Sequence, residues 1–391
     1  MTEQAIPARP PLWRNVRVLR VFGQIVFVLA VVYVLRELFL NMQFGFRRQG
    51  ITLDFDFLQQ RAGFDLSEGI AYGPNSSFWR AIRVGVINTI RVAVSGIVLA
   101  SILGLLIGVG RLSTNWLVRN VARVYVEIFR NTPVLIQIIF WYVAVILPLR
   151  LVGEDGEERL FFLSNRGLAV PWLRGRPGAG SWVPWLLAGL VAAVAVWWWR
   201  TRVNERTGRP HHRAPLALLA LAAVAAAGYL AAGGPFDIEL PAIDRGAYAG
   251  GVKVSGEFAG VLFGLVFYTA AFIAEIIRGS ILAVDKGQKE AAMAMGLTRF
   301  QQLRLVVLPQ ALRIAIPPIN SQYLNLTKNS SLAAAIAFPD LVQVSQTVIN
   351  QAGRPFQIII IVMGTYLILS MIISVLMNVA NRAVALRGTR R

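Results

Sequence analysis

The chain has 391 residues, of which 56% are hydrophobic and 15% charged, and its formal net charge is +19. Its apolar runs are long enough to span a bilayer, which predicts an all-α polytopic membrane protein. It contains no cysteine, which excludes disulfides, thiol catalysis and thiolate metal sites. Positive charge on this scale can indicate a nucleic-acid partner, but its distribution among the loops argues against one.

Eight hydrophobic segments are predicted to cross the membrane as helices. They are 24–40, 82–110, 133–150, 183–199, 214–232, 258–277, 314–337 and 356–381. Segments on the side of the two termini hold 23 of the 39 Lys and Arg against 5 acidic residues, whereas the opposite side holds 11 basic and 13 acidic residues. The positive-inside rule makes the first side cytoplasmic, so both termini are predicted to be cytoplasmic. The excess charge then serves topology and contact with anionic lipid, not nucleic acid.

The region 1–81 is predicted to hold a tail, one extra transmembrane helix and an external loop. Its first apolar run has span length and no small-residue cleavage site, so no cleavable signal peptide is expected. Arg36 and Glu37 are expected to close this span at the interface. Apolar residues recur throughout 41–81, which predicts a small folded lip instead of a disordered linker.

The region 82–150 is predicted to form the first part of a helical core. Its first span carries Asn88, Thr89 and Arg91. An arginine inside a membrane is costly unless it is paired or hydrated, and snorkelling to the outer boundary is favoured here over a substrate role. Small residues in the same span suit close helix packing. They are Gly96, Ser101, Gly104 and Gly108.

Between Arg111 and Arg130, apolar residues recur every three or four positions with arginines elsewhere, which predicts an amphipathic helix along the inner interface. Thr132 is expected to cap the next span, with Pro133 at its first position. The region 151–257 is predicted to contain outer loops and an inserted transmembrane hairpin that packs at the periphery. Its adjacent histidines at 211 and 212 have no acidic cluster nearby, which favours solvated loop residues over metal ligands.

A polar stretch at 285–309 lies between two long apolar segments. Asp285 and Gln288 have the pattern of a helix N-cap and its capping-box partner, and Gly296 is placed to end that helix in a left-handed C-cap. A second start signal at Thr298 and Gln301 precedes Pro309, which is expected to end the second helix. The predicted helix–turn–helix is a docking element for another protein, the alternative being an ordinary helical hairpin in a surface loop.

This stretch resembles the "EAA" loop of ABC importer permeases, which seats in a cleft of the cytoplasmic ATPase. The matching residues are Glu290-Ala291-Ala292, Gly296 and Leu308-Pro309. Further residues resemble the polar amino-acid (His/Gln/Glu/Arg) branch of that superfamily. They are Gln288, Arg304, Gln310-Ala311, Pro317-Pro318, Asn329-Ser330-Ser331-Leu332 and the run Val126 to Pro133. The extra first span, the outer lip and the inserted hairpin resemble the general L-amino-acid permease subunits.

The resemblance implies a type I ABC importer permease core at 82–150 and 258–391, with an ATPase-coupling loop at 285–309. The residues that it assigns to ATPase coupling are Gln288, Glu290, Ala291, Ala292, Gly296, Arg304, Leu308 and Pro309. It further implies a cytoplasmic ABC ATPase dimer that binds ATP and magnesium, a second and different permease subunit, a periplasmic amino-acid-binding protein and a bacterial inner membrane.

Span 314–337 is unusually polar. Pro317 and Pro318 remove two backbone donors, so a kink is expected there. Its polar groups cannot face lipid without cost and are predicted to line a cavity or a seam between subunits. With Asn88 and Thr89 they form the predicted substrate pathway: Asn320, Gln322, Tyr323, Thr327, Lys328, Asn329, Ser330 and Ser331. Lys328 with Ser330 and Ser331 is the hypothesised partner of a carboxylate, and Asn320, Gln322 and Tyr323 of an ammonium group or side chain. In the alternative, Lys328 pairs only with a nearby carboxylate.

No catalytic constellation, metal-spaced cluster or phosphate-binding loop is visible, so ATP is expected on another polypeptide and no cofactor on this chain. The predicted function is a permease subunit of an ATP-driven amino-acid importer. An ion-gradient-driven carrier is the first alternative, but Glu37 and Glu275 lie near span ends, where ion coupling is not expected. Glu275 is instead predicted to pair with Arg278, one helical turn away. A non-transporting scaffold is the second alternative and leaves the polar span unexplained.

Overall fold

The computed structural model describes residues 16–48, 50, 54–150, 160–207, 212–244 and 247–384. The chain divides into two units, Met1–Leu58 and Gln59–Arg391. In the first, helix α1 (Val16–Arg48) is apolar and exposed along most of its length, and a short 3₁₀ helix, η2 (Asp56–Gln59), begins after it. The backbone stays helical past Arg36 and Glu37, whose side chains pair with each other at 2.7 Å, to Arg48, and the expectation that these two residues mark the membrane interface stays a prediction.

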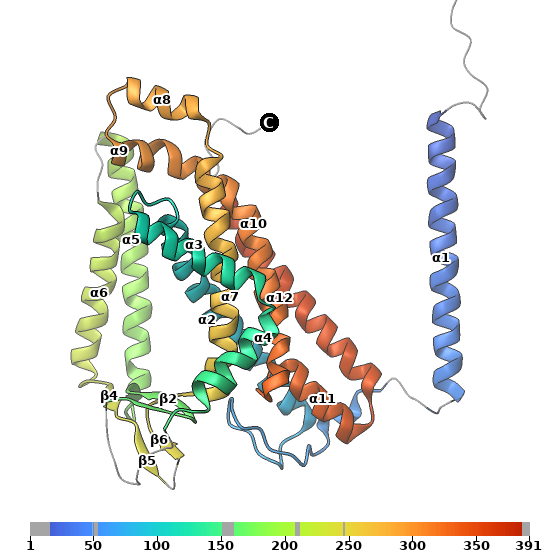
Figure 1. The fold of residues 1–391 in the computed structure, drawn as a ribbon. Coiled ribbons are helices and arrows are strands. Elements are labelled where there is room, and N and C mark those ends of the chain that lie inside the picture. Colours follow the sequence, from blue (N-terminus) through green and yellow to red (C-terminus); the bar gives the residue numbers. More distant parts are fainter. Residues whose placement is uncertain are drawn as a thin grey trace, which may run out of the picture. The chain divides into compact units, whose positions relative to one another are not determined.

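Three long helices, α2 (Phe78–Gly110), α7 (Gly256–Leu282) and α10 (Leu308–Asn329), supply most of the buried core of the second unit, and the largely exposed helix α12 (Pro355–Val384) packs against α10. Figure 1 shows α7 in the middle of this bundle, and it is the most deeply buried candidate span. A Cβ atom at Gly104 would lie 2.7 Å from Cβ of Ile273 on α7, and one at Gly96 would lie 3.0 Å from the side chain of Leu326 on α10. The small residues of α2 therefore permit the close packing that was predicted.

Helix α3 (Trp116–Asn131) runs across α7, and the chain then bends by 107° into α4 (Val134–Ile139), which continues as a π-helix, η3 (Phe140–Ile146). The amphipathic helix and the helix after it are both present, but Thr132 does not cap α4: its hydroxyl donates to the carbonyl of Ile128 at 2.9 Å, and α4 begins only after Pro133. The buried Gln137 amide holds the bend by donating to the carbonyls of Phe129 and Thr132, both at 2.9 Å. It thereby satisfies acceptors at the end of α3 that have no helical partner.

The insertion contains a helical hairpin, α5 (Val183–Thr207) and α6 (Arg213–Ala231), and small strands that the sequence did not predict. Its short 3₁₀ helix, η4, covers Ala179–Trp182. The strands are β1 (Phe162–Ser164), β2 (Gly167–Val170), β3 (Trp172–Gly175), β4 (Phe236–Glu239), β5 (Ala242–Asp244), β6 (Ala247–Ala249) and β7 (Val252–Ser255). All pairings are antiparallel, in the orders β1-β2-β7, β3-β4 and β5-β6. The hairpin packs mainly on itself, as expected of a peripheral element, with Gly228 against Trp185.

After α7 the chain forms α8 (Lys286–Ala294), α9 (Arg299–Gln301) and a π-helical turn, η5 (Gln302–Val307), which leads without interruption into α10. Pro309 therefore does not end the second helix. It lies where the π-helical turn η5 passes into α10.

Helix α10 continues as one α-helix through Pro317 and Pro318, so the kink expected there stays a prediction, and the α-helix is interrupted after Asn329. There a 3₁₀ helix, η6 (Ser330–Ile336), and Ala337 in the left-handed conformation (φ 58°) lead into α11 (Leu341–Ala352), in a segment predicted to lie outside the membrane.

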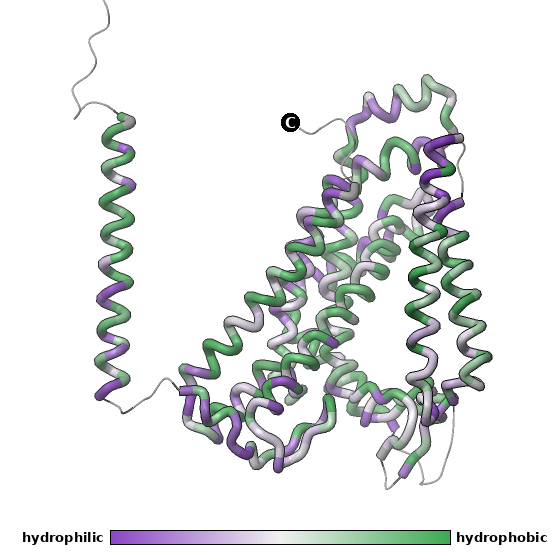
Figure 2. The backbone as a smooth tube through the Cα atoms, turned by 180° about the vertical axis from the view of Figure 1, so that it is seen from behind, coloured by the Kyte–Doolittle hydropathy of each residue, from purple (hydrophilic) through white to green (hydrophobic). Residues whose placement is uncertain are grey.

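Six described helices are long and apolar enough to span a membrane, and the number reaches eight if each of two bent pairs counts as one crossing. These pairs are α3 with α4–η3, and the α9–η6 segment with α11. Figure 2 shows hydrophobic residues along the middle of the second unit and polar segments at its two ends. The predicted eight spans therefore correspond to six unbroken helices and two interrupted ones.

Candidate functional site

The α8–α9 element lies at the end of the bundle opposite the strands (Figure 1). Asp285 caps α8, because its carboxylate accepts from the backbone N–H of Gly287 at 2.8 Å. The predicted capping box does not form: the Gln288 side chain instead accepts from Gln310 Nε2 on α10, at 3.4 Å. The Gln288 side chain thus links α8 to α10.

Gly296 ends α8 as predicted, with φ of 75°. The N–H of Leu297 donates to the carbonyl of Ala292 (3.2 Å) and that of Gly296 to Met293 (2.9 Å), which is the hydrogen-bond pattern of a Schellman turn. The next helix starts with the predicted capping box: Gln301 N–H donates to Thr298 Oγ1 at 3.4 Å, and Thr298 N–H to Gln301 Oε1 at 2.9 Å. Local hydrogen bonds therefore define both sides of the turn.

The element exposes a mixed surface. Glu290, Ala291 and Arg304 are exposed, and Ala292 is the buried member of the Glu-Ala-Ala run. Large apolar side chains that sequence reasoning missed are also exposed here, and they are Met293, Met295, Phe300, Leu303, Leu305 and Leu308. An apolar surface rimmed by charge is typical of a protein contact. The sequence could have revealed this apolar surface, because helices as short as α8 and α9 cannot bury so many large apolar side chains.

The base of the element is a small apolar cluster of Val284, Val307 and Ala311, with Ile281 packed against it. These residues join the end of α7 to the start of α10. At the same end, Glu275 of α7 pairs with Arg278 at 2.5 Å, as predicted, and also with Arg111, which caps α2. A displacement of α8–α9 would therefore act directly on α7 and α10, because no flexible linker separates them.

The predicted pathway residues of α10 lie on two different faces. On the inner face, the hydroxyls of Tyr323 and Ser101 are 2.7 Å apart, Thr327 donates to the Tyr323 carbonyl at 2.9 Å, and buried Ser330 donates to that of Thr327 at 2.7 Å. The partly buried Asn320 has a carbonyl oxygen, Oδ1, with no hydrogen-bond partner among the described residues. This face is mostly an internal network that joins α10 to α2.

The outer face presents Ser321, Asn325 and Lys328, all exposed, at positions i, i+4 and i+7, with Gln322 and Asn329 partly exposed beside them. Lys328 makes no ion pair with any residue that the structure describes. Ser331 donates to the Lys328 carbonyl at 2.7 Å, so its hydroxyl proton is already engaged within the helix end.

Asn88 and Thr89 are fully buried on α2. The Asn88 amide donates to the carbonyls of Glu68 (3.1 Å) and Pro339 (2.9 Å), and Thr89 Oγ1 accepts from the N–H of Leu341 at 3.0 Å. These two residues therefore connect α2 to the segment between η6 and α11. In this conformation they present no polar group to a cavity.

Arg91 extends to the lip, the segment predicted to lie outside the membrane, and is paired there. Its Nη2 lies 3.0 Å from Glu68 Oε1 in the lip, its Nη1 donates to Asn88 Oδ1 at 3.2 Å, and its guanidinium lies over the Phe258 ring. The sequence could not indicate this pairing, because the acid comes from a loop without regular structure.

Comparison of the sequence with known proteins identifies a family and several close relatives. The family described as "Binding-protein-dependent transport system inner membrane component" matches residues 214–387. The general L-amino acid transport system permease protein AapQ of Rhizobium johnstonii is 43% identical over 348 residues, covering 88% of this chain and 87% of that protein. The putative amino-acid ABC transporter permease protein YhdX of Escherichia coli is 41% identical and covers 93% of both chains.

A third relative is the glutamate/glutamine/aspartate/asparagine transport system permease protein BztB of Rhodobacter capsulatus, which is 37% identical over 93% of this chain and 92% of that protein. Similarity of this extent confirms the resemblance read from the motif at 285–309. The chain belongs to the amino-acid ABC transporter permeases, inner-membrane components of binding-protein-dependent transport systems.

Proposed function

We propose that the chain is one of two transmembrane subunits of an ATP-driven amino-acid importer, and that α8–α9 receives the movement of a cytoplasmic ABC ATPase dimer. The observation that carries this proposal is the α8–α9 element itself: a capped helix–turn–helix that projects from one end of the bundle and is rooted in α7 and α10 by Val284, Val307 and Ala311. Glu290, Ala291 and Arg304, together with the exposed methionines and Phe300, form the contact surface.

The ATPase supplies the ATP–magnesium site, since the sequence contains no phosphate-binding loop. Closure of its dimer would move α8–α9 and, through the apolar cluster, α7 and α10. Two access states of the membrane path are then different packings of these helices.

The second permease subunit would face the exposed strip of Ser321, Asn325 and Lys328, since three polar side chains in line are costly against lipid. Lys328 is the residue proposed to meet the carboxylate of a passing amino acid, together with neighbouring Asn329 and Gln322. A different permease chain as partner, a periplasmic amino-acid-binding protein and a bacterial inner membrane complete the proposed assembly. Amino acids as cargo are supported by the names of the relatives.

Reconstitution in proteoliposomes tests this proposal. The chain, its co-purifying permease and ATPase, and the binding protein are expected to take up amino acid only when ATP is supplied on the ATPase side. A Glu290→Arg variant should lose uptake while the complex without ATPase still assembles. Uptake by this chain alone under a proton or sodium gradient would contradict the proposal and favour a secondary carrier.

A further inference from the structure

Helices α2 and α7 are fixed to each other at the end of the bundle that carries α8–α9. A Cβ atom built at Gly108 would lie 2.9 Å from the carbonyl oxygen of Ala274, so no side chain separates the two helices there. At the end of α2, Arg111 pairs with Glu275 of α7, and the Arg111 side chain is only 14% exposed. Packing at a glycine leaves two helices free to slide, whereas a charge-assisted hydrogen bond fixes the position of one along the other.

Glu275 has two ion-pair partners among the described residues, and they differ in what they connect. Arg278 lies one turn further along α7, with its Nη2 2.5 Å from Oε1, so this pair stays within one helix. Arg111 comes from the end of α2 and pairs with Oε2, so this pair joins two helices. Replacing Arg111 would leave Glu275 paired with Arg278, and therefore would not leave an uncompensated carboxylate inside the bundle.

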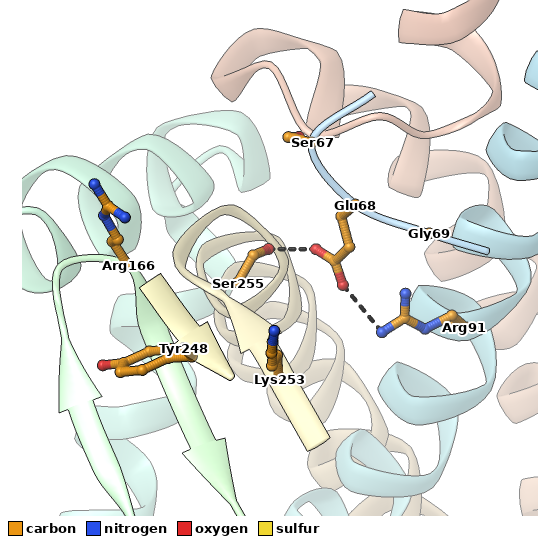
Figure 3. Close-up of a pocket in the computed structure, with 8 residues that line it drawn as sticks. All are labelled: Ser67, Glu68, Gly69, Arg91, Arg166, Tyr248, Lys253 and Ser255. Carbon is orange, nitrogen blue, oxygen red and sulfur yellow. Dashed lines mark hydrogen bonds and ion pairs between the residues drawn. The ribbon is translucent and has the colours of Figure 1, made fainter. Parts of the chain in front are cut away.

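The opposite ends of the two helices are joined as well. Arg91 of α2 pairs with Glu68 at 3.0 Å, and Glu68 in turn accepts from Ser255, which caps α7 (Figure 3). The Arg91 guanidinium also lies over the ring of Phe258 on α7. Because α2 and α7 are connected at both ends, we expect them to move together.

At this opposite end, α2 also holds the chain that follows η6. Thr89 Oγ1 accepts from the N–H of Leu341 at 3.0 Å, and a Cβ atom at Gly85 would lie 2.9 Å from Cα of the same residue. Asn88 donates to the carbonyl of Pro339 at 2.9 Å. Backbone atoms are in direct contact here, so a displacement of this end of α2 would move the segment 339–341 with it.

Helix α10 contacts α2 between these two ends. The Leu326 side chain packs against Gly96, and the hydroxyls of Tyr323 and Ser101 are 2.7 Å apart. A tilt of α2 about this contact would move its two ends in opposite directions relative to α10. The chain between α10 and 339–341 contains Ala337 in the left-handed conformation, and such strained positions are frequent in segments that change conformation.

We propose that Arg111 is a positioning residue for transport: its ion pair with Glu275 makes α2 follow α7, so that a displacement of α8–α9 is carried along α2 to the segment 339–341. Arg111 and Thr89 are roughly 33 Å apart along the helix, so α2 carries the displacement across most of the bundle. This inference rests on the proposed importer, and it adds a residue outside the α8–α9 contact surface on which coupling depends.

The test uses the complete transporter in proteoliposomes and measures the number of amino acids taken up per ATP hydrolysed. Arg111→Gln is expected to lower this ratio about fivefold, because loss of one charge-assisted hydrogen bond shifts a two-state equilibrium by a factor of that order. Arg111→Lys keeps the charge and should retain most of the coupling. The matched control is Arg278→Gln, which removes the other partner of the same carboxylate. It should leave the ratio within about twofold of the unaltered chain, since a pair within one helical turn contributes little.

A second readout reports on the segment itself. The chain has no native cysteine, and Ala335 on η6 is exposed, so Ala335→Cys provides a single labelling site in this chain. ATP should change the rate of maleimide labelling in the otherwise unaltered chain and in Arg278→Gln, but not in Arg111→Gln. A purely structural role of Arg111 would leave this ATP response in place.

Normal coupling in Arg111→Gln, an equal loss in Arg278→Gln, or an ATP response of labelling that survives in Arg111→Gln would overturn the inference. The absence of an ATP response in the otherwise unaltered chain, while uptake is driven by ATP, would overturn it too. If the unaltered complex takes up no amino acid with ATP, the importer proposal itself fails, and the inference fails with it.

Discussion

Replacing Gly296 by alanine perturbs the turn between α8 and α9 and nothing else. Its φ is 75°, and a Cβ atom built there would meet no atom within 4 Å. The cost is therefore that of the backbone alone, about 1–2 kcal/mol for a side-chain-bearing residue in the left-handed region. It falls on a local turn that joins a nine-residue helix to a three-residue one.

A penalty of that size lowers the population of the native turn relative to alternatives by a factor of roughly 5–30. We expect Gly296→Ala to reduce the number of amino acids transported per ATP hydrolysed, while the membrane helices remain folded. The assay is a paired measurement of uptake and phosphate release in proteoliposomes containing the complete transporter.

Two further variants sharpen the test. Gly296→Asn should retain much of the coupling, because asparagine enters the left-handed region at lower cost. Gly353 ends α11 with φ of 64° and also has no atom within 4 Å of a built Cβ. Gly353→Ala carries the same backbone penalty away from the proposed ATPase contact and should leave coupling intact. The reasoning is refuted if Gly296→Ala couples normally, or if Gly353→Ala uncouples to the same degree.

Three other outcomes are expected. The chain has no native cysteine, so Glu290→Cys should be labelled by an impermeant maleimide only from the cytoplasm and Asp244→Cys only from outside; the reverse pattern would invert the topology. Glu68→Gln removes a partly buried charge pair and should destabilise the lip by about 1–2 kcal/mol, seen as faster proteolysis within 60–77. In Gly264→Leu the first added atom would lie 2.6 Å from an isoleucine of α4, and this overpacking should lower the free energy of unfolding by about 1–3 kcal/mol, seen as a lower unfolding temperature. Gly364→Leu, with open space around the added side chain, should leave the unfolding temperature unchanged.

Local signals predicted the features that local interactions determine. The turn at Gly296 and the capping box of Thr298 with Gln301 involve residues at most a few positions apart, and both are present. Hydropathy located only part of each bent pair, and it located the six unbroken candidate spans to within a few residues except where a helix extends beyond its apolar stretch. The α1 helix is such a case, since charged Arg36 and Glu37 pair on its surface without ending it.

Features that depend on distant partners were not predictable. Gln288 could have closed a capping box, but Gln310 on another helix competes for it. Arg91 has an acidic partner in an irregular loop, and only the folded chain brings the two together. The strands are three or four residues long, too short for alternation to show, and α11 lies in a segment whose polar residues masked its helical pattern.

The sheet β1-β2-β7 also determines how the insertion is attached. Gly167 on β2 pairs with Ser255 on β7, so the chain leaves and rejoins the core at neighbouring points. Paired residues in such a ladder are about 4.5–5.5 Å apart, little more than the 3.8 Å between consecutive Cα atoms. A bridge of one or two residues could replace 168–254 without stretching the core. We therefore expect that the segment 168–254 can be exchanged between relatives as one unit, together with whatever properties it confers.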